Sequence, residues 1–332
     1  MRDPFGERPA KTSVRRVPLL GGAFEFRSSS TRLLRLVDEA YARLPRPRRA
    51  GRLPRFALRL ELQEGESFST REPPELRTRA GEGLICGTVT AADYAALHPQ
   101  TRAGFLSLSR EMLRFPYHAR YELIEFAVFT LASRAAALAP LHAACVGSKG
   151  RALLLVGESG AGKSTLTLQC MRQGLSLLAE DAVFIDPRTL LARGIPNFLH
   201  LRRDSLRFVD DAELVDAIRK SPVIQRRSGI RKFEVDLRDG RYRITSDAMK
   251  LAAVIFVSPK AADASGLLVP VPPTAAAARL KRSQRYAAGL ASWPPFIRSL
   301  EGVAAFELRR ARQPREMADA LTRLLWWGER HR

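Results

Sequence analysis

The chain has 332 residues, of which 45% are hydrophobic, and its formal net charge is +21. This hydrophobic content excludes wholesale disorder, and the length suits one large domain or two ordinary domains of roughly 150 residues. Arg makes up 47 of the 55 basic residues, a skew that a GC-rich coding bias alone would produce. The charge therefore fits either a solvated basic surface or an anionic partner.

Cysteine usage and hydropathy predict a cytoplasmic protein with no membrane partner. Cys86, Cys145 and Cys170 are far apart and form no CxxC pair, so we expect neither a disulfide framework nor a zinc site. The N-terminus has no apolar signal-peptide region. The most apolar helical stretch, 123–146, is interrupted by Arg134 and falls short of the ~20 apolar residues of a membrane span.

The N-terminal part of the chain predicts a small α+β domain over 17–115, preceded by a basic disordered tail at 1–16. Apolar and polar residues alternate over 56–62 as in a half-buried strand, and apolar residues recur with helical spacing around 31–44. The expected elements are strands at 17–27, 56–62 and 83–89, a helix at 31–44, and loops at 45–55 and 63–80. We assign no chemistry to this domain.

The second domain, 116–332, begins with helical apolar spacing over 121–138, and Pro140 is expected to end that helix. Residues 151–156 form a continuous apolar run, which is typical of a buried parallel strand. A helix and a further strand at 175–185 are expected next. The segment 314–327 predicts an amphipathic helix near the C-terminus.

A glycine-rich segment directly follows the apolar run. Residues 157–164 match GxxxxGK[ST], the pattern of a phosphate-binding loop between a strand and a helix. Glycines allow backbone N–H groups to turn inward around a phosphate, where a Cβ would interfere. We expect Lys163 to reach the β/γ phosphates and the Ser164 hydroxyl to ligate Mg²⁺. The predicted nucleotide-binding residues are Gly157, Glu158, Ser159, Gly160, Ala161, Gly162, Lys163, Ser164 and Thr165.

Two large classes of phosphate-loop protein are excluded. An ABC-type ATPase would carry an LSGGQ-like segment, which is absent, and a GTPase would carry NKxD, whereas the sole Asn is Asn197, in Ile-Pro-Asn-Phe.

An acidic pair, Glu180-Asp181, lies 16 and 17 residues after Ser164. A helix of about three turns between them would bring these carboxylates back beside the glycine loop. One carboxylate would then hold Mg²⁺ while the other accepts a proton from an attacking hydroxyl. Two anions this close are expected to raise each other's pKa, unless the metal neutralises one. The alternative is an ordinary pair of surface acids at a strand end.

Three segments occur together around this loop: His142-Ala-Ala, then Leu-Leu-Leu-Val-Gly157-Glu-Ser-Gly-Ala-Gly-Lys-Ser164, then Arg172-Gln-Gly174-Leu-Ser-Leu-Leu-Ala-Glu180-Asp181. This combination resembles the kinase core of HPr kinase/phosphorylase and its relatives, specifically over about 140–210 and weakly elsewhere. The resemblance implies an α/β fold with a P-loop-containing, phosphoenolpyruvate-carboxykinase/HPr-kinase-like core. It also implies that phosphate passes from ATP, with Mg²⁺, to a serine of a protein or peptide.

The resemblance also implies roles for individual residues. Lys163 and Asp181 would be catalytic, Asp181 as the general base, and His142 would contact Asp181 or the phosphate. Glu180 stands where the family usually has Asp, which suits a metal ligand beside Ser164.

Three cations are expected to stabilise the transferred phosphoryl group. Arg202 follows a segment that looks like the "G.P..L" stretch of smaller HPr-kinase-like proteins, while Arg231 and Lys232 lie in a basic stretch ahead of a predicted strand. For each of them a solvated surface position is the alternative.

The acceptor stays open at this point. The family's C-terminal helix for gripping HPr is not recognisable, so the resemblance does not extend to HPr as substrate. The positive charge suggests an acidic acceptor segment, and the family forms oligomers. A nucleic-acid-associated ATPase and a small-molecule kinase are the alternatives, although no RRM, zinc-finger or helicase motif supports the first.

Overall fold

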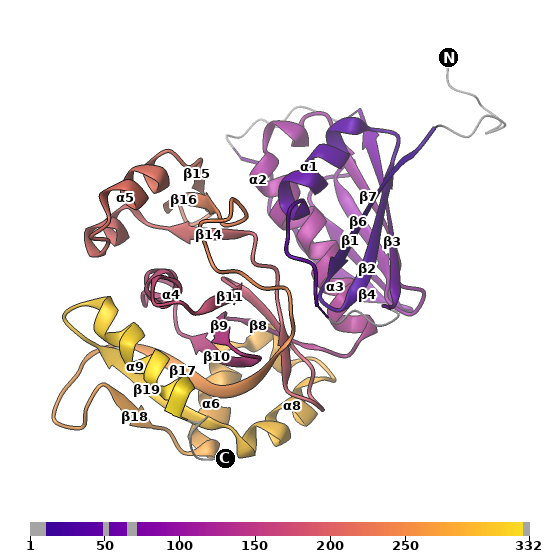
Figure 1. Cartoon of the computed structure of the whole chain (residues 1–332). Coiled ribbons are helices and arrows are strands. Elements are labelled where there is room, and N and C mark those ends of the chain that lie inside the picture. The colour runs from indigo at the N-terminus through magenta and orange to yellow at the C-terminus, as the bar shows by residue number, and fades with distance from the viewer. Residues whose placement is uncertain (1–10, 49–52, 65–71, 328–332) are drawn as a thin grey trace. The chain divides into compact units, whose positions relative to one another are not determined.

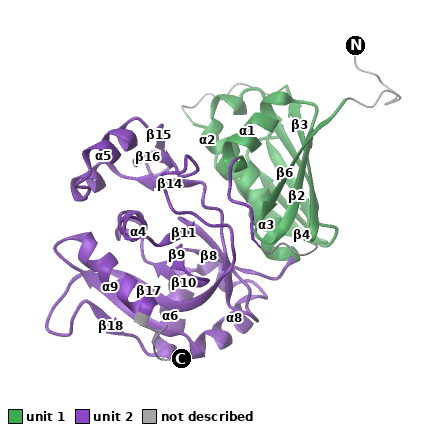
Figure 2. Cartoon of the chain, viewed as in Figure 1, with its two compact units in different colours: residues 1–42, 51–135 green, residues 43–50, 136–332 purple. Residues whose placement is uncertain are grey.

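The computed structural model describes residues 11–48, 53–64 and 72–327 (Figure 1). The chain forms two compact units: residues 1–42 with 51–135, and residues 43–50 with 136–332 (Figure 2). The segment at 43–50 belongs to the second unit, where Arg43 pairs with Asp236 at 2.9 Å and the Arg48 N–H donates to Asp247 at 2.7 Å. The units divide at 135/136, whereas the sequence pattern predicts a boundary near residue 115.

Unit 1 contains a seven-stranded sheet in the order β1-β2-β3-β7-β6-β5-β4. β2, β3 and β7 run parallel, and the remaining neighbours are antiparallel. The strands are β1 (Ser13–Leu19), β2 (Gly22–Ser28), β3 (Arg55–Gln63), β4 (Arg77–Gly81), β5 (Leu84–Thr88), β6 (Tyr94–His98) and β7 (Ala103–Ser109).

The N-terminal segment differs from the single strand predicted at 17–27. It forms a hairpin of β1 and β2, because Leu20 and Gly21 both adopt positive φ, as a tight two-residue turn requires. β1 begins at Ser13, so residues 13–16 are strand and not part of a disordered tail. Residues 1–10 of the predicted tail lie outside the described residues.

The helices of unit 1 pack on its sheet, α1 against β1, β2 and β3, and α3 against β6 and β7. The Ser30 side chain caps α1 by accepting from Leu33 N–H. The helices are α1 (Thr31–Tyr41), η1 (Met112–Arg114), α2 (Pro116–His118), η2 (Ala119–Ile124) and α3 (Glu125–Ala135). The helix predicted at 121–138 therefore ends at Ala135. Pro140 lies instead in β8, an edge strand, where a missing N–H is tolerated.

Unit 2 is built on a nine-stranded mixed sheet and a separate three-stranded antiparallel sheet in the order β14-β16-β15. The large sheet runs β11-β9-β10-β17-β13-β12-β8, and β19 pairs with both β17 and β18. Its strands are β8 (Ala139–His142), β9 (Ala144–Ser148), β10 (Arg151–Val156), β11 (Ser176–Ala179), β12 (Ala182–Ile185), β13 (Leu191–Arg193), β17 (Met249–Ala261), β18 (Leu268–Pro270) and β19 (Ala304–Arg310). The small sheet contains β14 (Phe198–Leu201), β15 (Val223–Gln225) and β16 (Arg231–Asp236).

Strand β10 is parallel to β17 and buried on both faces, which confirms the interpretation of its apolar run. Leu153 and Leu155 belong to the core that contains α4 and α9, while Leu154 and Val156 belong to the core that contains α6 and α8. The helices are α4 (Lys163–Arg172), η3 (Arg203–Phe208), α5 (Ala212–Arg219), α6 (Pro273–Ser283), α7 (Arg285–Ala288), α8 (Trp293–Ser299), η4 (Leu300–Gly302) and α9 (Pro314–Trp327). The helix α9 confirms the prediction at 314–327.

The segment expected to be one strand at 175–185 is two strands. β11 pairs with β9, whereas β12 pairs with β8 and β13 elsewhere in the sheet. Glu180 and Asp181 therefore lie in the short connection between the end of β11 and the start of β12. None of the helices in the described residues combines the length and the apolar character needed to cross a bilayer.

Candidate active site

The glycine loop connects the end of β10 to the start of α4. Gly160 and Gly162 have φ of 87° and 93°, in a region that side-chain-bearing residues rarely adopt, so the glycines are needed where the chain turns. Gly162 is the N-cap of α4, and Lys163 is its first residue. The loop therefore presents the free N–H groups and positive dipole end of α4, a site suited to an anion.

Lys163 is buried at the base of this loop. Its ammonium donates to the Gly157 carbonyl at 2.7 Å and to the Glu158 carbonyl at 3.2 Å. Burial lowers the pKa of Lys163, while Asp181 and Glu180 oppose that change by attracting the charged form. The ammonium is thus held against the loop by two backbone carbonyls.

Glu180 is buried, and its two carboxylate oxygens face different partners. Oε1 accepts from the Ser164 hydroxyl at 2.5 Å, and Oε2 lies 3.0 Å from His200 Nδ1. His200 lies on β14 directly across from Glu234 on β16, and its Nε2 is 3.7 Å from that carboxylate. Although burial alone would lower it, hydrogen bonds to Glu180 and Glu234 raise the pKa of His200 to about 9.

Asp181 points to a different partner from Glu180. The Arg226 guanidinium donates to its Oδ2 at 2.5 Å. Burial alone would raise the pKa of Asp181, but the charge and hydrogen bond of Arg226 hold it well below its usual range. The expectation that the two acids raise each other's pKa is therefore wrong for Asp181, because a cation from the turn between β15 and β16, Arg226, intervenes.

His142 contacts Asp181 through the main chain. Its Nδ1 lies 3.1 Å from the Asp181 carbonyl oxygen. Its own backbone N–H donates to Gln284 Oε1 at 2.7 Å, and Gln284 Nε2 donates back to its carbonyl at 3.1 Å. This clamp fixes the His142 backbone, while its side chain is exposed in the cavity beside the loop.

One cavity of about 630 Å³ joins these groups. The loop residues Ser159–Thr165 line it together with His142, Asp181 and His200. Seven Lys or Arg side chains line it against two carboxylates, Asp181 and Asp204. These cations are Lys163, Arg202, Arg207, Arg226, Lys232, Arg310 and Arg312. The cavity is strongly positive and suits a polyanionic ligand.

Of the predicted phosphate-stabilising cations, Arg202 and Lys232 line this cavity and Arg231 does not. Lys232 lines it and is half-buried, and burial together with the nearby Arg226 charge lowers its pKa. Arg202 lines it from an exposed position and faces Asp204 at 3.6 Å. Arg231 is exposed and is not among the lining residues. The Thr165 hydroxyl donates to Ser205 at 2.9 Å.

The donor set fits a hard divalent cation. Ligand atoms of Glu180, Asp181 and His200 all lie within 4.8 Å of one another, and the Ser164 hydroxyl touches Glu180. Hydroxyl and carboxylate oxygens are the ligands that Mg²⁺ takes. Glu180 and Ser164 would hold the ion, with Asp181 at its edge.

Three residues of the site were missed by sequence reasoning: His200, Glu234 and Arg226. Arg226 lies five residues before Arg231, in the same basic stretch as the predicted Arg231 and Lys232. Only the hairpin of β15 and β16 shows that Arg226 is the cation aimed at Asp181. His200 and Glu234 carried no local signal, because their relation is a cross-strand pairing.

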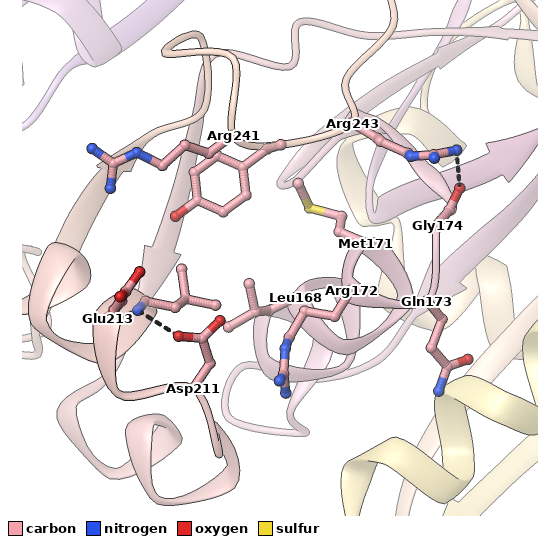
Figure 3. Close-up of a pocket in the computed structure, with 11 residues that line it drawn as sticks. Leu168, Met171, Arg172, Gln173, Gly174, Asp211, Glu213, Arg241 and Arg243 are labelled. Carbon is pink, nitrogen blue, oxygen red and sulfur yellow. Dashed lines mark hydrogen bonds between the residues drawn. The ribbon is translucent and has the colours of Figure 1, made fainter.

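A second cavity, of about 890 Å³, lies at the C-terminal end of α4 (Figure 3). Leu168 and Met171 form part of its apolar lining. Its charged groups are largely engaged: Arg172 pairs with Asp210 and Arg241 with Asp239, while Asp211 caps α5 by accepting from Leu214 N–H. The charged groups that are available to a ligand therefore gather at the first cavity, beside the glycine loop.

Comparison with known proteins supports the resemblance seen in the sequence. No protein-family profile matches the chain. Over 119 residues it is 31% identical to the HPr kinase/phosphorylase of Chlorobium phaeobacteroides (strain BS1), a match that covers 34% of this chain. The chain spans about a third (35%) of the length of this curated relative. The Hpr(Ser) kinase/phosphatase structure from Coxiella burnetii is 13% identical, with a TM-score of 0.29 over 57% of this chain and 90% of that one.

Proposed function

We propose that this chain is an ATP- and Mg²⁺-dependent kinase with a carboxykinase-like core, which phosphorylates a serine hydroxyl of a protein or peptide. One observation carries the proposal: Ser164, which lines the positively charged glycine-loop cavity, donates its hydroxyl to the buried Glu180 carboxylate at 2.5 Å. The similarity to an HPr kinase/phosphorylase over a third of the chain supports the same class of reaction.

Nucleotide binding would fall to the loop and Lys163. The N–H groups around Gly160 and Gly162 and the start of α4 would receive phosphate oxygens. The Lys163 ammonium would exchange its bonds to the Gly157 and Glu158 carbonyls for bonds to the β/γ phosphates. Mg²⁺ held by Ser164 and Glu180 would supply charge neutralisation at the phosphates.

Asp181 is suited to receive the proton of the acceptor hydroxyl. Because Arg226 holds it ionised, Asp181 is an acceptor at neutral pH, but its lone pairs are partly occupied by that guanidinium. Transfer of Arg226 from Asp181 to the phosphoryl oxygens would free the carboxylate and stabilise the transferred group at once. Arg226 would thus add to Arg202, Arg231 and Lys232, the three cations that the sequence predicts to stabilise the transferred phosphoryl group.

The charge around the cavity supports an acidic acceptor segment. Arg202, Arg207, Arg310 and Arg312 line it in addition to the cations nearest the loop, and all four are exposed. An acidic peptide would neutralise them at low energetic cost, whereas a basic peptide would be repelled.

Incubation of the purified chain with γ-labelled ATP, Mg²⁺ and a library of serine-centred peptides tests the proposal, with parallel reactions that contain free serine or nucleic acid. We expect label on peptides with acidic flanks, none on matched peptides with Ala at the centre, and none with the Lys163→Ala variant. Label on free serine alone would indicate a small-molecule kinase instead. ATP hydrolysis that nucleic acid stimulates, with no peptide label, would contradict the proposal in favour of an ATPase.

A further inference from the structure

A row of three buried titratable side chains extends from the candidate metal ligand into the protein. Glu180, His200 and Glu234 are all about 5% exposed or less. Burying charged groups is expensive unless each is paired, and replacing such a row with apolar residues usually costs little. A buried row whose middle member, His200, lines a reactive cavity therefore calls for a functional explanation.

The geometry of this row is directional. His200 Nδ1 binds Glu180 Oε2 at 3.0 Å, which leaves Oε1 facing the Ser164 hydroxyl. On the other side of the ring, Nε2 faces the Glu234 carboxylate at 3.7 Å. The antiparallel register of β14 and β16 places His200 directly opposite Glu234, so the small sheet builds this arrangement.

We propose that His200 and Glu234 are positioning residues that fix Glu180 as an oxygen ligand and keep imidazole out of the metal site. This inference rests on the proposed function, since it assigns the metal-binding role to Ser164 and Glu180. With both ring nitrogens directed at carboxylates, the ring orients the ligand and does not bind the ion itself. Partners behind a metal ligand typically alter metal affinity by about 10–100-fold.

The same geometry makes the site selective. An oxygen-only site favours Mg²⁺, whereas imidazole favours ions such as Ni²⁺ or Zn²⁺. His200 offers a nitrogen within 4.8 Å of the ligand oxygens of Glu180 and Asp181, close enough to join a coordination sphere if the ring were released. Glu234, by holding the far side of the ring, opposes that release.

Metal titrations separate these contributions. The Mg²⁺ and Ni²⁺ affinities of the full chain, with and without ATP, are measured by calorimetry for wild type, His200→Leu, His200→Asn and Glu234→Gln. We expect His200→Leu to weaken Mg²⁺ binding about 10–100-fold without changing the binding of metal-free ATP. His200→Asn should recover much of this loss, because its amide can donate to Glu180 from about the place of Nδ1.

Glu234→Gln provides an independent test. It should shift the Ni²⁺-to-Mg²⁺ preference about tenfold toward Ni²⁺, since a freed imidazole is a better ligand for Ni²⁺. The combination of Glu234→Gln with His200→Asn should abolish that shift. A purely structural role for the row would lower thermal stability and leave the metal preference unchanged.

His118→Leu is the matched control, because His118 is also buried and lies 3.1 Å from a glutamate, Glu122, but in unit 1. It should leave both metal affinities at the wild-type level. Wild-type Mg²⁺ affinity in a folded His200→Leu variant, or an unchanged metal preference in Glu234→Gln, would overturn the inference. A wild-type chain that binds no ATP would overturn the proposed function instead, while the nucleotide-free titrations still test the inference.

Discussion

Both units bury carboxylates, and one from each, Asp93 and Glu180, are satisfied in different ways. In unit 1, Asp93 is 1% exposed and accepts from the Ser109 N–H at 2.6 Å, the Thr90 hydroxyl at 2.7 Å and the Ser109 hydroxyl at 3.1 Å. In unit 2, Glu180 is 5% exposed and meets one hydroxyl and one imidazole, with Lys163 and Asp181 nearby.

The difference lies in the kind of partner. Neutral donors from its own turn and from Ser109 at the end of β7 satisfy Asp93, so its charge serves to anchor a loop to a sheet. Glu180 shares its surroundings with groups that titrate and that come from separate elements, beside a positive cavity. We expect a buried carboxylate with partners like those of Glu180 to respond to a charged ligand, and variants of Asp181, Lys163, Asp93 and Arg226 test this difference.

The largest effect is expected from Asp181→Asn. The amide cannot take up the acceptor proton, so peptide phosphorylation should fall about 10²–10⁴-fold. Because Asp181 is not one of the phosphate-binding groups, the affinity for ATP should stay near that of the wild type. Rapid-quench measurement of transfer, with calorimetry of ATP binding, checks both parts; wild-type transfer would remove the base assignment.

Lys163→Ala should act on binding. Loss of charge-assisted hydrogen bonds to phosphate costs about 1.5–3 kcal/mol each, so ATP affinity should fall roughly 10–100-fold or more. Calorimetry with ATP and with AMP provides the measurement, and the weakening should be largest for ATP. Equal losses for both nucleotides would mean that the ammonium does not reach the terminal phosphates.

Asp93→Ala should change stability and not binding. It leaves the buried Ser109 N–H without its acceptor, which costs about 1–3 kcal/mol of unfolding free energy. Urea unfolding of unit 1, followed by circular dichroism, checks the loss, while ATP binding at unit 2 should be unaltered. Reduced ATP affinity in the folded variant would contradict the purely structural role of Asp93.

Arg226→Met should produce the smallest change, and one that depends on pH. Folding lowers the pKa of Asp181 below its ordinary value of 3.8. A carboxyl of this kind stabilises the folded state at pH values above 3.8, and this stabilisation is lost as the pH falls through the pKa of the folded state. Both side chains are partly exposed, so the loss at pH 7 should be at most about 1 kcal/mol. Urea unfolding is measured from pH 7 downward, and the difference in unfolding free energy between wild type and variant should shrink below pH 3.8. A difference that does not change with pH would mean that Asp181 is not its source.

Several elements were predictable because their signals are local. The amphipathic pattern of α1 and its Ser30 cap lie within a few residues of each other, and α1 ends where Arg43 adopts positive φ. The apolar run of β10 indicated burial on both faces. The hairpin turn at Leu20-Gly21 was missed, since a leucine is an unusual residue for positive φ.

For the site, the sequence by itself determined the strand, the glycine loop and the lysine that begins α4, because the pattern is contiguous and Gly160 and Gly162 occupy positions whose positive φ favours glycine. Only the tertiary structure decided which cation faces Asp181 and which residues stand behind Glu180. Arg226 is 45 residues from Asp181, and His200 is 20 residues from Glu180. Such pairs depend on how strands are ordered and registered in a sheet, and many distant contacts determine that order together.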